Sequence, residues 1–361
     1  MMYNISMQYP PISTAPHIQH KQIGNNKRIK LSVAKIFFAS FLFIFLISIY
    51  FLFPLYQKVW ITLFSPTFSI IVLPDTQKYS ADDPELFCKQ TKWIVDNIQK
   101  KNIVFVSHVG DIVDGWKFKK KQWEDASKCL ETLDGHIPYS IVPGNHDTET
   151  GSRDSGLQTY NTYFPVSRYS SYDWYKGNRR ENANSYQMLK IWGIEFLFIG
   201  LEVEPSNNSI DWAKDIVEKH PHAYTAITTH KYLPDNGLAR DKSREYSNEG
   251  NTGEDIWKKL IEDNCSIKLV WSGHFHGEDG EAILTSTNNC GYKVYQTMQN
   301  YQTREKGGNG KLRIYTFNPK KKEIRVQTYS PVTDSFEIDA SSDFTIPFMF
   351  EYKDSWWRIK P

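Results

Sequence analysis

The sequence predicts an α/β domain in which two packed β-sheets are flanked by helices, preceded by one transmembrane helix. Three observations support this fold class. From Phe68 onward, short apolar runs alternate with amphipathic stretches of helical period, which is typical of an α/β domain. Beyond Gly277 the segments are strand-like, which favours a second sheet packed beside the first. A long uncharged apolar run precedes both regions.

The N-terminal region divides into a tail, a membrane segment and a linker over residues 57–67. Residues 1–35 are polar and contain five basic and no acidic residues, which suits a cytoplasmic tail. Residues 36–56 are apolar and uncharged, and a helix of that length spans a hydrocarbon core of about 30 Å. We expect a signal anchor that places the C-terminal domain outside the cytoplasm. The alternative is a secreted domain released by signal cleavage, although the apolar region of a signal sequence is usually only about 7–15 residues long.

Charge and cysteine content limit the function classes. Subtracting the five positive charges of the tail from the formal net charge of +2 leaves −3 for the remaining chain, so no basic nucleic-acid surface is implied. The four cysteines show no CxxC spacing. In an exported domain their even number permits two disulfides without specifying the pairing, and buried thiols are equally compatible with Cys88, Cys129, Cys265 and Cys290.

Within the domain, apolar periodicity places the individual elements. The best helix candidate is Pro84–Lys100, with Asp83 as its N-cap. Further helices are expected, with Ser209 and Thr252 as caps and Gly135 as a stop, at Lys119–Leu133, Ser209–Lys219 and Gly253–Asp263. Late strands are expected at Tyr292–Thr297, Leu312–Phe317 and Glu323–Tyr329. The domain should span residues 68–332, and a C-terminal extension over 333–361 either packs on it or lies at the bilayer interface.

Five apolar runs each end in a polar cluster. Because the carboxyl ends of parallel strands lie along one edge of a sheet, these clusters should converge in one crevice. Together they supply carboxylates, imidazoles and amides without cysteine, which suits hard or borderline divalent ions rather than a thiolate zinc site. The clusters are Asp75-Thr76-Gln77, Gly110-Asp111-Ile112-Val113-Asp114, Gly144-Asn145-His146-Asp147, Thr229-His230 and Gly273-His274-Phe275-His276-Gly277.

In this order, the clusters resemble the signature of the calcineurin-like metallophosphoesterase family: D-x-H, G-D-x-x-D, G-N-H-[DE], a lone His and G-H-x-H. The resemblance covers roughly residues 68–332. It implies a metallophosphoesterase α/β sandwich that hydrolyses a phosphoric ester with a metal-bridging hydroxide. The implied cofactors are two divalent metal ions, of which Mn²⁺, Fe²⁺, Zn²⁺ and Mg²⁺ are candidates.

The resemblance also assigns roles to single residues. Asp111 would bridge both ions, since a shared carboxylate offsets the repulsion between two cations. Asp75, Gln77 and His276 would complete one metal site, and the second would be completed by Asn145, His230 and His274. The resemblance makes His146 the group that stabilises or protonates the departing oxygen, and Asp114 the residue that orients its ring.

Two positions depart from the family pattern. Gln77 stands where histidine is commonest, so either a neutral amide oxygen ligates the first ion or that site is weak. Gly115 stands where the protein serine/threonine phosphatases carry a phosphate-clamping arginine, which favours a phosphodiester or small-molecule phosphomonoester as substrate. The alternative function is a catalytically inactive binding or receptor protein at a membrane, with Gln77 as the sign of lost activity.

Other polar residues near the clusters are kept outside the predicted site. His108 lies in an apolar run and is expected to be a hydrogen-bonded core residue. Arg240, Arg304 and the Gly307–Gly310 loop could reach a substrate phosphate, but arginines and glycine turns are common.

Overall fold

The computed structural model of the protein describes residues 35–45, 67–116, 119–277 and 279–350. The chain forms two compact units, Met1–Tyr56 and Gln57–Pro361. In the first unit, residues 35–45 are helical and their large apolar side chains are exposed. The rest of the predicted transmembrane span, residues 46–56, lies outside the described residues. Within the described ranges, no helix combines the length and hydropathy that a membrane crossing requires.

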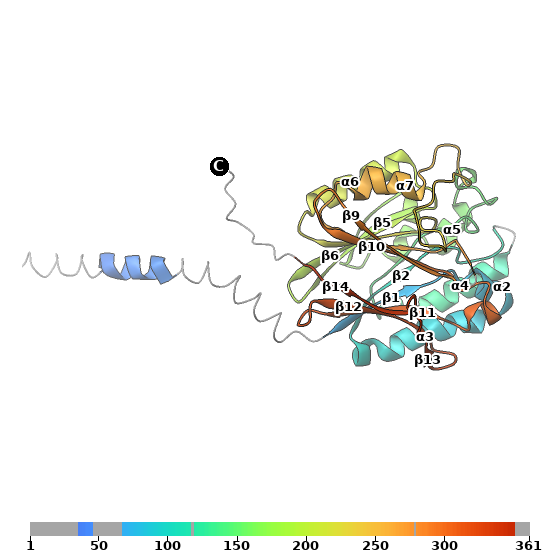
Figure 1. The fold of residues 1–361 in the computed structure, drawn as a ribbon, viewed down its shortest axis with the longest axis horizontal. Coiled ribbons are helices and arrows are strands. Elements are labelled where there is room, and N and C mark those ends of the chain that lie inside the picture. The colour runs from blue at the N-terminus through green and yellow to red at the C-terminus, as the bar shows by residue number, and fades with distance from the viewer. Residues whose placement is uncertain (1–34, 46–66, 117–118, 278, 351–361) are drawn as a thin grey trace, which may run out of the picture. The chain divides into compact units, whose positions relative to one another are not determined.

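The first sheet of the second unit is mixed (Figure 1). Its strand order is β13-β12-β11-β1-β2-β3, with β14 also paired to β12. The central pairs β1–β2 and β2–β3 are parallel, whereas β11 runs antiparallel to β1. Its strands are β1 (Phe68–Leu73), β2 (Ile103–His108), β3 (Tyr139–Ile141), β11 (Leu312–Asn318), β12 (Glu323–Ser330), β13 (Ser335–Phe336) and β14 (Asp343–Pro347).

The second sheet has the order β4-β5-β6-β7-β8-β10-β9, and its central strands β6, β7, β8 and β10 are parallel. Its strands are β4 (Tyr175–Arg179), β5 (Asn184–Ile191), β6 (Ile194–Leu201), β7 (Tyr224–Thr229), β8 (Ile267–Ser272), β9 (Glu281–Thr287) and β10 (Lys293–Gln299). The two packed sheets confirm the predicted architecture. The expectation that the second sheet lies beyond Gly277 is wrong, because that sheet begins at β4 and the chain returns to the first sheet at β11.

The return of β11 to the first sheet follows from its two apolar faces. Ile314 packs toward the outer helices, while Tyr315 and Phe317 pack between the sheets. A strand that is apolar on both sides is stable only where both faces are covered, and the position beside β1 provides such cover. On β1 itself, Ile70 faces the space between the sheets and Ile71 faces the helices.

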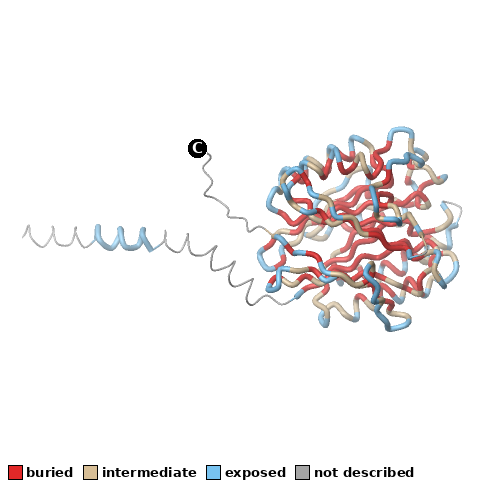
Figure 2. Tube along the Cα trace, viewed as in Figure 1, coloured by how far each residue is buried: buried red, intermediate tan, exposed pale blue. Residues whose placement is uncertain are grey.

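Helices cover the outer face of each sheet, and the strands between them are buried (Figures 1 and 2). One apolar cluster joins the first sheet to α3 and α4, and a second joins the other sheet to α6 and α7 with its π-helical continuation. The helices are α2 (Gln77–Asp82), α3 (Pro84–Lys101), α4 (Lys120–Glu131), α5 (Gln158–Tyr163), α6 (Asn207–Lys219), α7 (Gly253–Ile256) and the π-helix Trp257–Ile261.

The starts of three helices differ in how they are capped. The cap of α6 is Ser206, whose hydroxyl accepts the backbone N–H of Ser209, so the expected cap at Ser209 is wrong and Ser209 lies in the first turn. Thr252 caps α7 as expected, in a reciprocal capping box with Asp255. Asp83 occupies the N-cap position of α3, but its side chain makes no capping hydrogen bond.

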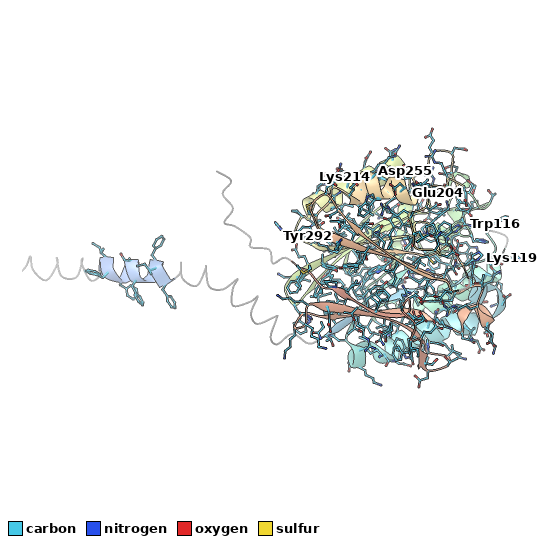
Figure 3. All side chains as sticks on the ribbon, viewed as in Figure 1. Trp116, Lys119, Glu204, Lys214, Asp255 and Tyr292 are labelled. Atoms are coloured by element: carbon cyan, nitrogen blue, oxygen red, sulfur yellow. A yellow bond between two sulfur atoms is a disulfide. The ribbon has the colours of Figure 1, made fainter. Side chains whose placement is uncertain are left out.

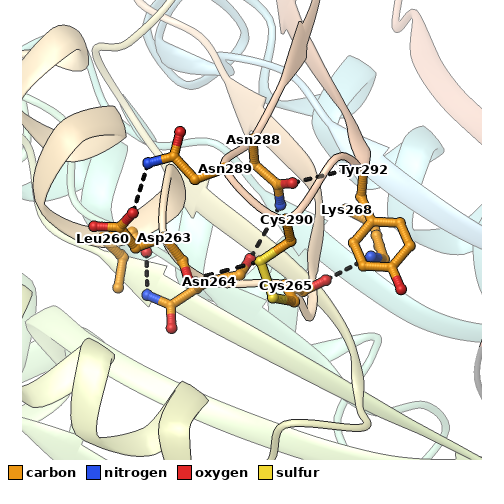
Figure 4. The surroundings of a disulfide bond; sticks show 9 residues. All are labelled: Leu260, Asp263, Asn264, Cys265, Lys268, Asn288, Asn289, Cys290 and Tyr292. Atoms are coloured by element: carbon orange, nitrogen blue, oxygen red, sulfur yellow. Dashed lines mark hydrogen bonds between the residues drawn. A yellow bond between two sulfur atoms is a disulfide. The ribbon is translucent and has the colours of Figure 1, made fainter.

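Two disulfides resolve the cysteine alternatives. Cys88–Cys129 joins α3 to α4, and Cys265–Cys290 joins the segment before β8 to the turn between β9 and β10. Figure 4 shows the second bridge, beside which the Lys268 ammonium lies 3.6 Å from the ring centroid of Tyr292.

The described domain begins and ends at one pole. β13 and β14 pair with β12, so the first sheet extends past the boundary expected at residue 332. Phe348, which follows β14, packs on Phe68 at the start of β1, with 6.4 Å between ring centroids. Trp356 and Trp357 lie outside the described residues. In Figure 3, Tyr292 lies at one end of the domain, and Trp116 and Glu204 lie toward the other.

Candidate metal centre

Three ligand-type side chains meet where strands of both sheets end. Asp111 follows β2 in the first sheet, whereas His230 and His274 follow β7 and β8 in the second. Asp111 Oδ2 lies 3.1 Å from His230 Nε2, and that nitrogen lies 3.2 Å from His274 Nδ1. Among the described residues, these atoms form one of two groups of acidic or histidine side chains close enough to share a metal ion. Asp111 and His230 are buried, and His274 is half-buried.

The imidazole of His230 is oriented by the backbone of the facing sheet. Its Nδ1 lies 3.0 Å from the carbonyl oxygen of Val109. A proton on Nδ1 donated to this carbonyl leaves the Nε2 lone pair facing Asp111 and His274, as a metal ligand requires. The hydrogen-bond pattern therefore favours the tautomer that binds a cation.

The electrostatics of the group show a preference for positive charge. Burial alone would raise the pKa of Asp111, but His230 together with His146 and His274 outweighs burial and lowers that pKa to about 2. Burial alone would lower the pKa of His230, but the Asp111 carboxylate raises it overall. Burial and the charge of His230 lower the pKa of His274 to about 3. The Asp111 carboxylate thus favours positive charge beside His230, and a divalent cation there would compensate it.

The backbone around Asp111 is unusual and explains two glycines of the motifs. Asp111 has φ of 52°, a left-handed conformation that non-glycine residues adopt rarely. A Cβ atom on Gly144 would lie 2.1 Å from Asp111 Oδ1, and one on Gly110, whose φ is 97°, would lie 2.9 Å from His230 Nδ1. Glycine at position 144 lets the loop after β3 approach the Asp111 carboxylate, and glycine at position 110 leaves room for the His230 ring.

A second group of side chains shares Asp111. Gln77 donates through Nε2 to Asp75 Oδ2 and to Asp111 Oδ2, each at 3.2 Å. Asn300, which follows β10, donates to the same Asp75 oxygen at 3.1 Å. Burial and the neighbouring Asp111 raise the pKa of Asp75. The carboxylates of Asp75 and Asp111 thus both face the Gln77 amide. A flip of this amide exchanges its nitrogen and oxygen, so the oxygen can point between the two carboxylates, where a cation would need it.

Asn145 provides an independent test of whether the residues fit a metal. Its Oδ1 is buried and has no hydrogen-bond partner in the described structure. A buried polar atom without a partner is costly, and a cation held beside Asp111 would provide one. Carboxylate, imidazole and amide groups together form a donor set for a divalent cation, and the residues present therefore fit the metals that the fold implies.

His276 and His146 occupy the edge of this region. His276 is exposed and is not among the converging atoms. His146 is half-buried, and its Nδ1 lies 2.9 Å from the backbone oxygen of Asp114. The Asp114 carboxylate is farther from that nitrogen, at 3.9 Å, and pairs with Lys78 at 3.3 Å. It is therefore the carbonyl of Asp114 that holds the His146 ring.

Asp147 and Asn300 have structural roles that the sequence analysis did not assign. Asp147 is fully buried and accepts the backbone N–H groups of Ile112, Val113 and Gly144, which ties the loop after β3 to the loop after β2. Burial and the charge of Asp111 raise its pKa to about 7. Asn300 follows a strand as the other clusters do, and this position is the signal that could have identified it.

The residues kept outside the predicted site have other partners. His108 is buried and hydrogen-bonds Thr76 Oγ1 at 2.9 Å, which confirms its core role. Arg240 pairs with Glu254 and Arg304 with Glu337. In the second group of carboxylates, Asp279, Glu281 and Asp339, the first two are already paired with arginines.

Comparison with known proteins agrees with this geometry. A family model described as calcineurin-like phosphoesterase matches residues 68–278. The uncharacterized protein YvnB of Bacillus subtilis (strain 168) is 30% identical over 268 residues, which are 73% of this chain and 20% of that protein. The chain thus spans about one fifth of that relative's length.

Two solved structures align with most of this chain. A dimetal phosphatase from Danio rerio superposes with a TM-score of 0.50 at 12% identity, over 79% of this chain and all of that one. A purple acid phosphatase from yellow lupin (Lupinus luteus) gives 0.49 at 14% identity, over 78% of this chain and 54% of that one. The family match and the converging motif residues lead to one conclusion: the chain belongs to the calcineurin-like phosphoesterase family, a family of phosphoric ester hydrolases.

Proposed function

We propose that the chain hydrolyses a phosphoric ester at a centre that holds two divalent metal ions. The observation that carries the proposal is the position of Asp111, which belongs to both groups of ligand atoms. Its Oδ2 lies 3.1 Å from His230 Nε2 on one side and 3.2 Å from Gln77 Nε2 on the other. A carboxylate shared in this way can neutralise two cations at once.

The proposed ligands form two sets around that carboxylate. His230, His274 and the unpartnered oxygen of Asn145 hold one ion with Asp111. Asp75, Gln77 and His276 hold the other, and Asn300 orients Asp75. When bound, the ions supply positive charge that polarises the phosphoryl group and lowers the pKa of water.

Two further residues complete the proposal: His146 acts on the leaving group, and Asp147 fixes the loops. His146 Nδ1–H donates to the Asp114 carbonyl, so Nε2 is the nitrogen left to face a departing oxygen, and the ring gives up the Nε2 proton from its doubly protonated form. The backbone N–H of His146 donates to Asp111 Oδ1 at 2.9 Å, which couples the ring's position to the metal ligand. The proposed roles are general acid for His146 and fixation of the loop for Asp147.

Gly115 supports a phosphodiester or a small phosphomonoester as substrate, because it provides no side chain that could clamp a protein-bound phosphate. The second candidate function, an inactive binding or receptor protein, is favoured only by Gln77. In its present orientation, the Gln77 amide donates to both carboxylates and so satisfies them without a metal.

For the location of the domain, we propose a single-pass anchor formed by residues 36–56, with the hydrolytic domain outside the cytoplasm. The two disulfides support an oxidising compartment. A secreted form produced by signal cleavage accounts for the disulfides equally well. A topology reporter fused after Pro361 tests the anchor, since activity only in the cytoplasm would contradict it.

The experiment that tests the function measures hydrolysis of bis(p-nitrophenyl) phosphate and p-nitrophenyl phosphate by the full-length chain with Mn²⁺, Fe²⁺, Zn²⁺ or Mg²⁺. Asp111→Asn is the test variant, and Asp82→Asn, on the exposed surface of α2, is the matched control. Metal-dependent turnover that is lost only in Asp111→Asn supports the proposal, and the two substrates rank the ester class. A chain that binds no metal and turns over neither ester supports the inactive alternative.

A further inference from the structure

The segment Asp241–Ser247 passes beside the metal centre and is fixed by buried charge. Lys231, the residue after the ligand His230, is fully buried, and its ammonium lies 2.7 Å from Asp241 Oδ2 and 3.2 Å from Glu204 Oε1. Glu204 is also buried, and its carboxylate accepts the backbone N–H groups of Glu245 and Tyr246. Buried charges are retained only when paired and hydrogen-bonded, so this network holds the segment in one place.

The backbone of Tyr246 is held on both sides. Its N–H donates to Glu204 Oε2 at 2.9 Å, and its carbonyl oxygen accepts from the backbone N–H of Arg153 at 2.7 Å and from the Ser152 hydroxyl at 2.9 Å. The donors come from the loop that follows Asp147, and the acceptor comes from the loop after β6. Two other loops, the one after β6 and the one that follows Asp147, therefore fix the position of Tyr246.

The phenol of Tyr246 reaches the metal-ligand histidine. Its hydroxyl lies 3.5 Å from His274 Nε2, and the two rings meet edge to face with centroids 5.3 Å apart. The other nitrogen of the same ring, Nδ1, points at His230 Nε2 from 3.2 Å. The His274 imidazole thus faces Tyr246 with one nitrogen and His230 with the other.

We propose that Tyr246 is a positioning residue, whose hydroxyl oxygen accepts the Nε2–H of His274 and so keeps Nδ1 free to bind the metal. The inference rests on the proposed function, because it requires that His274 is a ligand. A ring that can carry its proton on either nitrogen loses metal affinity when the wrong tautomer is populated, and partners of ligating histidines typically account for about 10- to 100-fold in affinity.

The test compares the full-length wild type with Tyr246→Phe, which removes the hydroxyl and keeps the ring contact. Tyr295→Phe, on β10 and away from the ligand cluster, is the matched control. Zn²⁺ and Mn²⁺ affinities are measured by competition with a fluorescent chelator. Turnover is measured at low and saturating metal, and unfolding of the metal-free chain in urea is followed in parallel.

The expected result is an affinity about 10- to 100-fold weaker for one ion in Tyr246→Phe only, with turnover restored by saturating metal and an unchanged urea midpoint. Wild-type affinity in Tyr246→Phe overturns the inference. So does turnover that saturating metal does not restore, which would place the hydroxyl on the substrate, and so does a lowered urea midpoint, which would make its role structural. If the wild type itself binds no metal, the proposed function fails, and the inference fails with it.

Discussion

Arg313 Nη2 lies 3.0 Å from Glu281 Oε2, and neither side chain is exposed to solvent. Arg313 belongs to β11 of the first sheet and Glu281 to β9 of the second, so this ion pair joins the two sheets. The Glu281 carboxylate also accepts the hydroxyls of Tyr301 and Ser342, each at 2.6 Å. These contacts hold the ion pair in one geometry. Removing either member would leave the other buried with an unbalanced charge.

Glu281→Gln should therefore destabilise the domain by about 3–5 kcal/mol, because it leaves the Arg313 guanidinium buried without a counter-charge. Urea unfolding measures the change. Glu323→Gln, on the partly exposed part of β12, is the control and should change stability by less than about 0.5 kcal/mol. A loss of less than about 1 kcal/mol in Glu281→Gln would mean that water reaches the pair.

The same pair predicts how stability depends on pH. Burial would raise the pKa of Glu281, but Arg313 and the neighbouring hydroxyls outweigh burial and lower it below its usual value of 4.5. The native state therefore binds its proton less readily than the unfolded state does. The contribution to stability is fully present above the unfolded pKa and is lost as pH falls through the lower folded pKa. The difference in unfolding free energy between wild type and Glu281→Gln should be constant from pH 6 to 8 and shrink below about pH 4.5. A difference that grows toward acid pH would contradict this sign.

Asp147→Ala should destabilise the domain, because it leaves the backbone N–H groups of Ile112, Val113 and Gly144 without their hydrogen-bond acceptor. Each buried unsatisfied donor costs about 1–3 kcal/mol. Asp147→Asn should cost less, since its amide oxygen still accepts. Thermal or urea unfolding of the metal-free chain distinguishes the two variants, and equal losses would show that the negative charge, rather than the hydrogen bonds, carries the effect.

His146→Gln should slow hydrolysis most for esters with poor leaving groups. A general acid contributes about 10²- to 10⁴-fold when the departing oxygen needs a proton, and little for a nitrophenolate, which leaves unaided. The measurement compares kcat for alkyl and p-nitrophenyl esters in the variant and in His136→Gln, an exposed control. Equal slowing for both esters would assign His146 to substrate binding instead.

Gln77→His should strengthen binding of one Zn²⁺ or Mn²⁺ ion, because an imidazole nitrogen is a better ligand for these ions than an amide oxygen. Gln77→Ala should weaken the same binding event, and Gln99→His, on the exposed surface of α3, is the control for a new surface imidazole. Calorimetric titration of the metal-free chain resolves the two events. If neither change at position 77 alters binding, Gln77 is not a ligand.

Local patterns in the sequence were sufficient to predict much of the fold. Periodicity located α3, α4 and the late strands to within a few residues, and the recurring polar clusters at strand ends were sufficient to predict that Asp111, His230 and His274 meet. The assignment of strands to sheets was not predictable in this way, because β11 and β8 are both short apolar runs. The sheet that each strand joins depends on which residues cover its two faces, and these contacts form only when the core packs.

Within the site, the sequence motifs could not show contacts made by loops. Tyr246 and Glu204 lie in irregular segments without periodicity or a motif, and their contact through the Tyr246 N–H depends on where two separate loops end. The role of Asp114 was also not predictable from the motif, because its backbone carbonyl rather than its carboxylate approaches His146. Motifs identify side chains, whereas these interactions depend on main-chain positions.

The contact between Phe68 and Phe348 brings both ends of the described domain to one pole, at the start of β1, whose opposite end leads to Asp75 and Gln77. Covalent attachments made at either end therefore leave from the same side. Such a domain can be inserted into a longer polypeptide, joined in tandem or coupled to a solid support through one short patch, while the pole that bears Asp111, His230 and His274 stays turned toward the surrounding solution.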